Sequence, residues 1–173
     1  MRSPYCFMCR PVGGVRYDSV NKSGLVLSAS LEDHTTTNRQ AEIISLPLNY
    51  SGEIQVGDIL LVHHNTFRKY FDMKGREKSS PSFFKDDLFL IFPDQYFMYS
   101  RDGVWYAPSP YCFMSLCDEP LTAIVEYPNI DMINAGILKG DKVVYQPDSD
   151  YEFRIDDKKL YRMFNRNICI QLT

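Results

Sequence analysis

Two short stretches of the chain resemble each other: Val56-Gly57-Asp58-Ile59-Leu60-Leu61-Val62 and Lys139-Gly140-Asp141-Lys142-Val143-Val144-Tyr145. In both, a Gly-Asp pair precedes a run rich in apolar and β-branched residues. Glycine adopts positive φ without steric cost and aspartate hydrogen-bonds nearby backbone amides, so each pair predicts a sharp turn into a strand. We interpret both pairs as turn signals rather than as phosphate-binding or catalytic residues.

Further landmarks accompany the two Gly-Asp turns in the same order. The hexapeptide Ser-Pro-Tyr-Cys-Phe-Met occurs at 3–8 and again at 109–114. An Asp-Asp pair precedes a strand-like run in each half, at 86–87 and at 156–157. Because chance identity over six residues is improbable in so short a chain, three ordered landmarks indicate an internal duplication.

The boundary between the two copies is expected within 100–110, where Arg-Asp-Gly and two prolines interrupt regular structure. The sequence therefore predicts one domain over 1–104 and a shorter one over 105–173. The first is longer because it carries two unmatched segments, about 10–40 and about 64–83.

The secondary structure expected from the sequence is almost entirely strand. Runs rich in β-branched and aromatic residues, bounded by Gly, Pro, Asn or Asp, lie at 5–9, 41–46, 58–63, 88–92, 96–99, 122–126, 142–145 and 168–172. A single helical turn is expected around 130–135, capped by Asp131. This pattern predicts an all-β protein built from barrels or sandwiches.

The unmatched segment 10–40 is expected to form a long exposed loop. It contains Gly13-Gly14, Ser23-Gly24 and a polar run at 32–38, a composition that does not suit a packed core. The apolar triplet Leu25-Val26-Leu27 within it could enter an apolar groove of a partner and pair its backbone there. The alternative is that the triplet is an ordinary edge strand of a hairpin.

The order of these features resembles the co-chaperonin family typified by GroES. In that family a first strand leads into a flexible loop with a short hydrophobic grip sequence, then a strand, a roof hairpin and a Val-Gly-Asp strand. Here 23–28 resembles the grip sequence and 40–44 resembles the strand after the loop. The closest local match is 54–62, and the second half is similar from Gly136 onward.

The resemblance implies two irregular GroES-like β-barrels in tandem, with the mobile loop in the first only. It implies a non-enzymatic co-chaperonin without a cofactor, which forms a homo-oligomeric ring, heptameric in the family. Such a ring caps a GroEL-like chaperonin ring, encloses unfolded protein substrates and follows the ATP cycle of its partner. The residues that would bind the chaperonin are Ser23, Gly24, Leu25, Val26, Leu27 and Ser28.

The sequence departs from the family pattern in three places. The roof region, 47–52, is short, the second copy has no loop, and the insertion 64–83 separates the strands that would close the first barrel. The missing loop of the second copy and the insertion favour an alternative, a structural or assembly protein, for example a viral one, built on the same barrel without chaperonin binding. A phage-encoded co-chaperonin would act in the host cytoplasm.

Four cysteines, Cys6, Cys9, Cys112 and Cys117, are weak candidates for zinc ligands. Cys6 and Cys9 fall in an expected strand, where an odd separation points side chains to opposite faces. We therefore expect structural cysteines, no metal and no catalytic site. Five cysteines without an export signal indicate reduced thiols and a cytoplasmic protein.

The charge balance and the hydropathy pattern bear on the partners. The chain has 22 acidic and 19 basic residues, so its electrostatics give no reason to expect nucleic acid. Aromatic and basic residues in 64–83 could stack single-stranded bases, but the net charge argues against it. Because no apolar run approaches the roughly 20 residues that cross a bilayer, we expect no membrane association.

Overall fold

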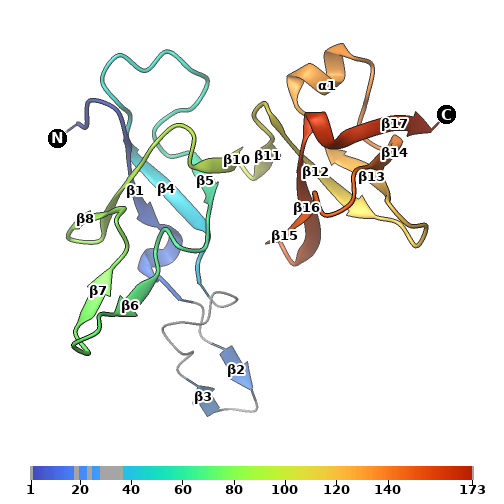
Figure 1. The fold of residues 1–173 in the computed structure, drawn as a ribbon. Helices are drawn as coiled ribbons and strands as arrows, with labels where there is room; N and C mark the ends of the chain where they lie inside the picture. Colours follow the sequence, from blue (N-terminus) through green and yellow to red (C-terminus); the bar gives the residue numbers. More distant parts are fainter. Residues whose placement is uncertain (1, 18–19, 23–24, 28–36, 173) are drawn as a thin grey trace. The chain divides into compact units, whose positions relative to one another are not determined.

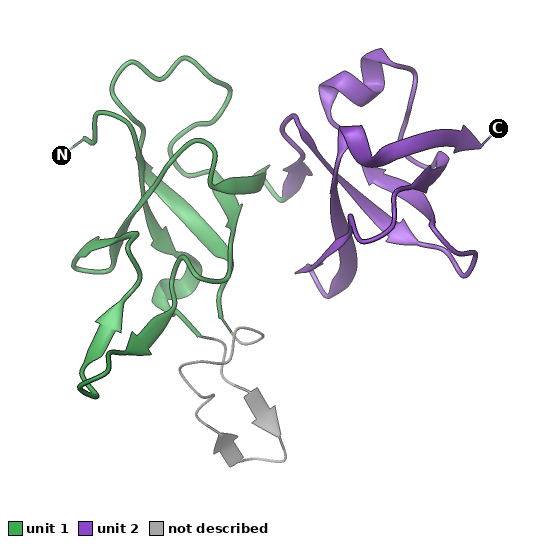
Figure 2. Ribbon diagram, in the orientation of Figure 1, with its two compact units in different colours: residues 1–103 green, residues 104–173 purple. Residues whose placement is uncertain are grey.

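The computed structural model describes residues 2–17, 20–22, 25–27 and 37–172 of the chain. The protein is all-β, as the sequence predicts: the described residues form antiparallel sheets and a single short α-helix. The chain divides into two compact units, 1–103 and 104–173 (Figure 2). This division falls next to the Asp-Gly pair in the stretch where the sequence places the domain boundary.

Unit 1 is built on one antiparallel sheet, in which neighbouring strands follow the order β10-β5-β4-β1-β9-β8 (Figure 1). These strands are β1 (Phe7–Pro11), β4 (Gln40–Ser45), β5 (Ile59–Val62), β8 (Phe83–Lys85), β9 (Leu88–Ile91) and β10 (Tyr96–Arg101). Two small antiparallel sheets lie outside it. They pair β2 (Val20–Lys22) with β3 (Leu25–Leu27), and β6 (Lys69–Phe71) with β7 (Glu77–Ser79).

Unit 2 begins with β11 (Val104–Tyr106) and has a main antiparallel sheet in the order β17-β14-β13-β12-β16-β15. Its strands are β12 (Tyr111–Leu116), β13 (Thr122–Tyr127), β14 (Lys142–Tyr145), β15 (Tyr151–Ile155), β16 (Lys158–Phe164) and β17 (Ile168–Leu172). Helix α1 (Ile130–Asn134) connects β13 to β14. When β12 is matched to β1 and β13 to β4, both units have the same strand order.

Bulges at matching places fix the correspondence between the two sheets residue by residue. In unit 1 the pairing of β1 with β4 shifts register between Met8 and Cys9, and Cys9 lies opposite Ile43. In unit 2 the pairing of β12 with β13 shifts between Phe113 and Met114, and Met114 lies opposite Val125. Cys9 therefore occupies the place of Met114.

This correspondence corrects the role that the sequence assigns to the hexapeptide. The two copies of Ser-Pro-Tyr-Cys-Phe-Met are out of step by one residue, because Phe7 matches Cys112 rather than Phe113. A slip of one residue turns a strand's side chains to the other face. Phe7 packs in the core of unit 1, whereas Phe113 lies on the opposite face from Cys112 and contacts Phe153 edge to face at 5.7 Å. The duplication rests on the other two landmarks.

Matched positions of the two sheets fill the two hydrophobic cores. The pairs, unit 1 first, are Phe7 and Cys112, Cys9 and Met114, Ala41 and Ala123, Ile43 and Val125, Leu60 and Val143, Val62 and Tyr145, and Ile91 and Met163. The side chains differ in size at most of these places, so each core is packed in its own way around one shared backbone pattern.

The Gly-Asp pairs form the turns that the sequence predicts. Gly57 and Gly140 have φ of 91° and 93°, the left-handed region that favours glycine. The Oδ2 atom of Asp58 accepts a hydrogen bond from the Gln55 amide at 2.8 Å, and the Oδ2 atom of Asp141 accepts one from the Leu138 amide at 2.8 Å. Both aspartates thus close the same turn, which explains why this dipeptide precedes a strand in each half.

Asp58 carries an ion pair that its counterpart in unit 2 does not share. Arg101 donates from Nε to Asp58 Oδ1 at 2.9 Å and from Nη2 to Oδ2 at 2.7 Å, and Asp58 is 4% exposed. Burial alone would raise the pKa of Asp58, but the hydrogen bonds from Arg101 and from the Gln55 amide outweigh it and lower that pKa. Asp141 instead accepts a hydrogen bond from the side-chain amide (Nε2) of Gln171 at 2.8 Å.

The Asp-Asp pairs also form equivalent turns. Asp86 and Asp87 have φ of 47° and 56° between β8 and β9, and Asp156 and Asp157 have φ of 49° and 61° between β15 and β16. Positive φ at both central residues is the signature of the hairpin turn that matches strand twist. The interpretation of these carboxylates as turn residues is therefore confirmed.

Some details of the sequence prediction were wrong. The first strand covers Phe7–Pro11 rather than 5–9. The expected helical turn is present, but its cap is Asn129, whose side chain accepts from the Met132 amide at 3.1 Å, and not Asp131. The strands β6, β7, β8 and β11 were missed because three residues each are too few to show a periodicity. The longer β12 and β15 were also absent from the expected strands, although β15 alternates apolar and polar residues.

Candidate functional site

The segment that joins β1 to β4 in unit 1 is the main candidate for a functional element. In unit 2 the matched strands β12 and β13 are joined by residues 117–121 alone. In unit 1 the connection runs over 12–39 and leaves β1 through the short 3-10 turn η1 (Val12–Gly14). Gly13 and Gly14 have φ of 71° and 69°, so this change of direction requires glycine.

Asn38 closes the stem of this loop. Its side-chain amide donates to the carbonyls of Val12 at 3.0 Å and Val15 at 2.9 Å, so it joins the outgoing and the returning chain. Its backbone amide donates to the carbonyl of Arg16 at 2.9 Å, and an antiparallel bridge pairs Tyr17 with Thr37. The two ends of the loop are therefore held side by side before the chain enters β4.

Arg16 anchors the stem to the body of unit 1. Its Nη2 donates to Oδ1 of Asp87 at 2.6 Å and its Nη1 donates to Oγ of Ser79 at 3.1 Å. The guanidinium also lies over the rings of Phe83 and Phe89, 4.9 Å from each centroid. The Arg16 side chain is 12% exposed, whereas that of Asp87 is 59% exposed, so water screens the ion pair and the contacts with the two rings are the better shielded ones.

Tyr17 anchors the stem to the insertion. Its hydroxyl oxygen accepts a hydrogen bond from the Lys69 amide at 2.7 Å, where β6 begins. Ser79, the Oγ partner of Arg16, is the last residue of β7. The insertion 64–83, to which the sequence assigned no role, thus supports the base of the loop.

The predicted grip residues are described only in part. Leu25–Leu27 form β3, which pairs with β2 in a register that sets Leu25 opposite Lys22 and Leu27 opposite Val20. Ser23, Gly24 and Ser28 lie outside the described residues. The backbone of the apolar triplet is therefore a strand of a two-stranded sheet, the arrangement that the hairpin alternative expects.

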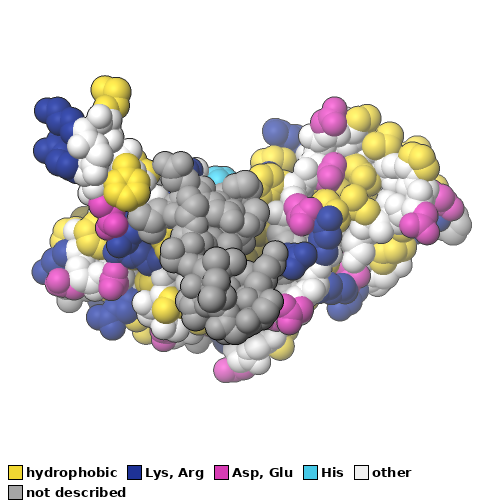
Figure 3. Space-filling model, turned by 90° about the horizontal axis from the view of Figure 1, so that it is seen from below, with side chains coloured by type: hydrophobic (Ala, Val, Ile, Leu, Met, Phe, Trp, Pro, Cys, Tyr) yellow, Lys and Arg dark blue, Asp and Glu magenta, His cyan; other side chains and the backbone are white. Residues whose placement is uncertain are grey.

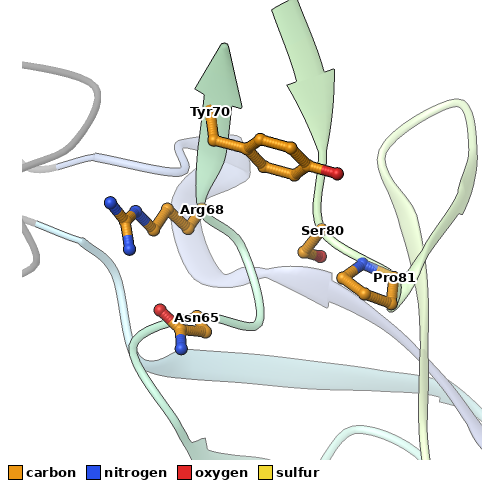
Figure 4. Close-up of a pocket in the computed structure, with 5 residues that line it drawn as sticks. All are labelled: Asn65, Arg68, Tyr70, Ser80 and Pro81. Atoms are coloured by element: carbon orange, nitrogen blue, oxygen red, sulfur yellow. The ribbon is translucent and has the colours of Figure 1, made fainter. Parts of the chain in front are cut away.

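A pocket of about 250 Å³ lies at the base of the β6–β7 hairpin. Figure 4 shows the side chains that line it, contributed by Asn65, Arg68, Tyr70, Ser80 and Pro81. Ser80 Oγ donates to the carbonyl of Thr66 at 2.5 Å, which ties the two ends of the insertion together. The Nε atom of Arg68 is buried and has no hydrogen-bond partner among the described residues.

The cysteines do not assemble a metal centre in the part of the chain that the structure describes. No cluster of three or more His, Cys, Asp or Glu side chains suited to a metal ion occurs among those residues. Cys9 and Cys112 are fully buried in the two cores, and burial raises the pKa of both thiols, that of Cys112 to about 12. Cys6 is also buried, Cys117 is half-buried, and all are free thiols. The protonated, buried thiols of Cys9 and Cys112 behave as small apolar side chains.

Sequence reasoning located the loop but missed Arg16, Tyr17 and Asn38, the residues that hold it. Each stands in a polar stretch without periodicity, and each contact partner is distant in sequence. The Gly13-Gly14 pair was the one local signal that the chain turns sharply after β1.

Comparison with known proteins adds no family assignment, because neither a family model nor a curated protein sequence matches the chain. Among the helices of the described residues, none has the length and apolar character required to cross a bilayer.

Proposed function

We propose that the protein is a co-chaperonin that caps a GroEL-like chaperonin ring through the loop between β1 and β4. The observation that carries this proposal is the contrast between the two units. On one shared topology, unit 1 has a long loop held by a fixed stem, and unit 2 has a five-residue connection. A protein that needed only the sheet would have no reason to hold a long loop in this way.

We further propose that each unit is a GroES-like barrel. The order of landmarks in the sequence supports it, together with the Val-Gly-Asp turn that leads into β5. The sheet topology that the two units share supports a tandem pair that arose by duplication. The proposal includes no catalytic site, and the proposed co-chaperonin acts without a cofactor of its own.

The loop's chemistry suits reversible docking. Leu25-Val26-Leu27 offers an apolar segment whose backbone can pair with a groove on the partner. So short a segment makes few contacts with a partner, so one loop binds weakly and can be released. Several identical loops on one ring would supply the missing affinity through effective concentration.

Ring assembly, heptameric as in the GroES family, is part of the proposal. In the described part of unit 2, β17 forms one edge of the sheet, and its Ile170 and Leu172 side chains are exposed. An edge strand with exposed apolar residues is suited to pair with another copy of the chain. Native mass spectrometry of the purified protein tests this: a ring supports capping, and a monomer favours the alternative below.

Deletion of 23–28 tests the docking role of the loop. We expect the deletion variant to keep its fold but to lose its effect on chaperonin ATPase activity and on the refolding of an unfolded client protein. The exposed Leu138 in unit 2 offers a control, because Leu138→Ser removes an apolar surface residue without touching the loop. Unchanged ATPase and refolding in the deletion variant would exclude chaperonin capping.

The second candidate function is a structural or assembly protein, such as a viral one, that uses the same barrels without a chaperonin. The observation in its favour is the β6–β7 insertion, which capping does not require. This candidate predicts that the intact protein leaves chaperonin ATPase activity unchanged at any concentration.

A further inference from the structure

The pocket at the base of the β6–β7 hairpin receives side chains from both sides of the hairpin. Arg68 and Tyr70 belong to the chain that enters β6, and Ser80 and Pro81 follow β7 (Figure 4). The backbone amide of Ser80 donates to the carbonyl of Arg68 at 3.1 Å, so hydrogen-bonded backbone fixes the two sides relative to each other. At about 30 Å³ for each water molecule, the pocket volume corresponds to about eight waters, which is room for a small organic molecule.

The hairpin separates its charges between its two faces. Lys69 and Glu77 form an ion pair at 2.8 Å on one face. Tyr70 lies opposite Lys78 and therefore shares the other face with it, and alternation along the chain places Arg68 on this face too. The face that bears the pocket thus carries two basic side chains, and none of the five residues that line the pocket is acidic.

Arg68 is the charged group of the pocket, and it forms no ion pair with any described residue. Its Nε atom is buried and also lacks a hydrogen-bond partner among these residues. A buried N–H without an acceptor is unfavourable, so such a group is normally paired with protein, water or a ligand. Because the side chain as a whole is half-buried, an oxyanion in the pocket can contact its guanidinium.

The charge of the whole insertion favours an anion. Residues 64–83 include five basic and two acidic side chains in a chain whose net charge is −3. Both acids have partners of their own, because Lys69 pairs with Glu77 and Arg76 pairs with Asp72 at 3.0 Å. Figure 3 shows a face of the molecule on which Lys and Arg side chains lie beside hydrophobic ones. The field around the pocket is therefore positive and attracts negatively charged ligands.

We propose that this pocket binds a small molecule that carries a phosphate or carboxylate group. The guanidinium of Arg68 holds the oxyanion through two parallel N–H···O hydrogen bonds, the geometry in which arginine recognises both groups. The side-chain amide of Asn65 and the hydroxyl of Tyr70 are further donors. The Tyr70 ring and Pro81 offer apolar walls to the rest of the ligand. This site does not depend on the proposed co-chaperonin function.

An NMR titration of the full-length protein tests the site with two probes, glycerol 3-phosphate and succinate. We expect saturable binding with a dissociation constant of about 1 mM or below for at least one probe. The largest shifts should occur at the Arg68 Nε–H and at the amides of 65–70 and 78–80. Ionic strength is kept constant, because added salt alone screens the surface charges. The probe that binds more tightly identifies the preferred oxyanion. Shifts spread over both units, or no saturation with either probe, would overturn the proposal.

Arg68→Gln should weaken binding of the tighter probe about tenfold, because it removes the charge and the paired donors. Arg76→Gln is the matched control, the same substitution on an arginine of the same hairpin that does not line the pocket and whose side chain is 65% exposed. It should leave the affinity unchanged. Lys78→Gln should weaken binding about twofold, since Lys78 adds attraction without lining the pocket.

The two arginine variants decide the role of Arg68. Equal affinities of Arg68→Gln and Arg76→Gln would show that Arg68 does not hold the anion, and the proposal would fail. Circular dichroism verifies that each variant is folded. If Arg68→Gln does not fold, the shifts of the unmodified protein decide, because binding at this pocket must perturb the Arg68 Nε–H.

Discussion

Units 1 and 2 share a strand order, a bulge in the first strand and a Gly-Asp turn, yet their connections differ. Between the first two matched strands, unit 1 has a long anchored loop and unit 2 has 117–121. Between the third and fifth, unit 1 inserts the β6–β7 hairpin, and unit 2 has only the short β15. The sheets are constrained by pairing and burial, whereas the connections can vary and carry function.

The same comparison separates the interactions that define the shared fold from those that belong to one unit. The hydrogen bond from a backbone amide to the Gly-Asp carboxylate recurs at 2.8 Å in both units. In unit 1, Asp58 pairs with the charged side chain of Arg101. At the matched turn of unit 2, Asp141 accepts instead from the neutral side-chain amide of Gln171. Substitutions at matched positions should therefore have unequal effects.

The largest difference in the loss of unfolding free energy is expected in the cores, at the matched pair Phe7 and Cys112. Both side chains are fully buried, but the phenyl ring is much larger than the thiol. We expect Phe7→Ala to cost about 3–5 kcal/mol of unfolding free energy and Cys112→Ala about 1 kcal/mol. Urea unfolding of the full chain measures both. Equal costs would contradict the tight packing of the Phe7 ring in the core of unit 1.

Asp58→Asn should cause the next largest loss of unfolding free energy. The substitution leaves the guanidinium of Arg101 without its carboxylate partner, and we expect a loss of about 1–3 kcal/mol, reduced from the buried limit because Arg101 is partly exposed. Asp141→Asn, the matched control, should cost about 0.5 kcal/mol, since Asp141 accepts hydrogen bonds from the Leu138 amide and from Gln171 but forms no ion pair with any described residue. Thermal unfolding compares the two. A larger loss for Asp141→Asn would overturn the assignment of the ion pair.

The dependence of stability on pH should report the contribution of Asp58. The pKa of Asp58 in the folded protein lies below its unfolded value of about 3.9, so its contribution is fully present above that value. The contribution is lost as pH falls through the lowered pKa. Between about pH 5 and pH 2, the unmodified protein should lose more unfolding free energy than Asp58→Asn. Parallel pH profiles would show that Asp58 is not the group responsible.

The smallest effect is expected at the stem of the loop. Tyr17→Phe removes the hydroxyl that accepts from the Lys69 amide and should cost about 1 kcal/mol locally. Global stability should change little, but hydrogen exchange at the Lys69 amide should accelerate about fivefold. Tyr106→Phe, on an exposed tyrosine of unit 2, serves as control. An unchanged exchange rate at Lys69 would mean that Tyr17 does not hold the insertion.

Local patterns in the sequence were sufficient to predict the strands and turns that local chemistry dictates. The Gly-Asp turns, the Asp-Asp hairpins and strands such as β14 follow from glycine, aspartate and β-branched residues at short range. The hexapeptide misled the prediction because residue identity does not report which face a strand buries. Only the pairing of Cys9 with Ile43 and of Met114 with Val125 reveals the shift.

The candidate site could be located from the sequence but its architecture could not. Composition marks 10–40 as a loop, yet the contacts of Arg16 with Asp87 and of Tyr17 with Lys69 join residues far apart in the chain. No periodicity or propensity encodes such contacts, because they depend on how β1, β6 and β9 pack together. The same holds for the insertion 64–83, which appears in the sequence as an ordinary basic and aromatic stretch.

The central claim is that function resides in the loop of unit 1 and that the fold does not require it. The matched registers allow a direct exchange, because Pro11 and Gln40 correspond to Leu116 and Thr122. Replacing 12–39 with 117–121 gives unit 1 the connection of unit 2. The account predicts a folded protein, by circular dichroism, whose affinity for a GroEL-type ring with ATP falls at least a hundredfold. A folded exchange variant that binds the ring as tightly as the unmodified protein would contradict it.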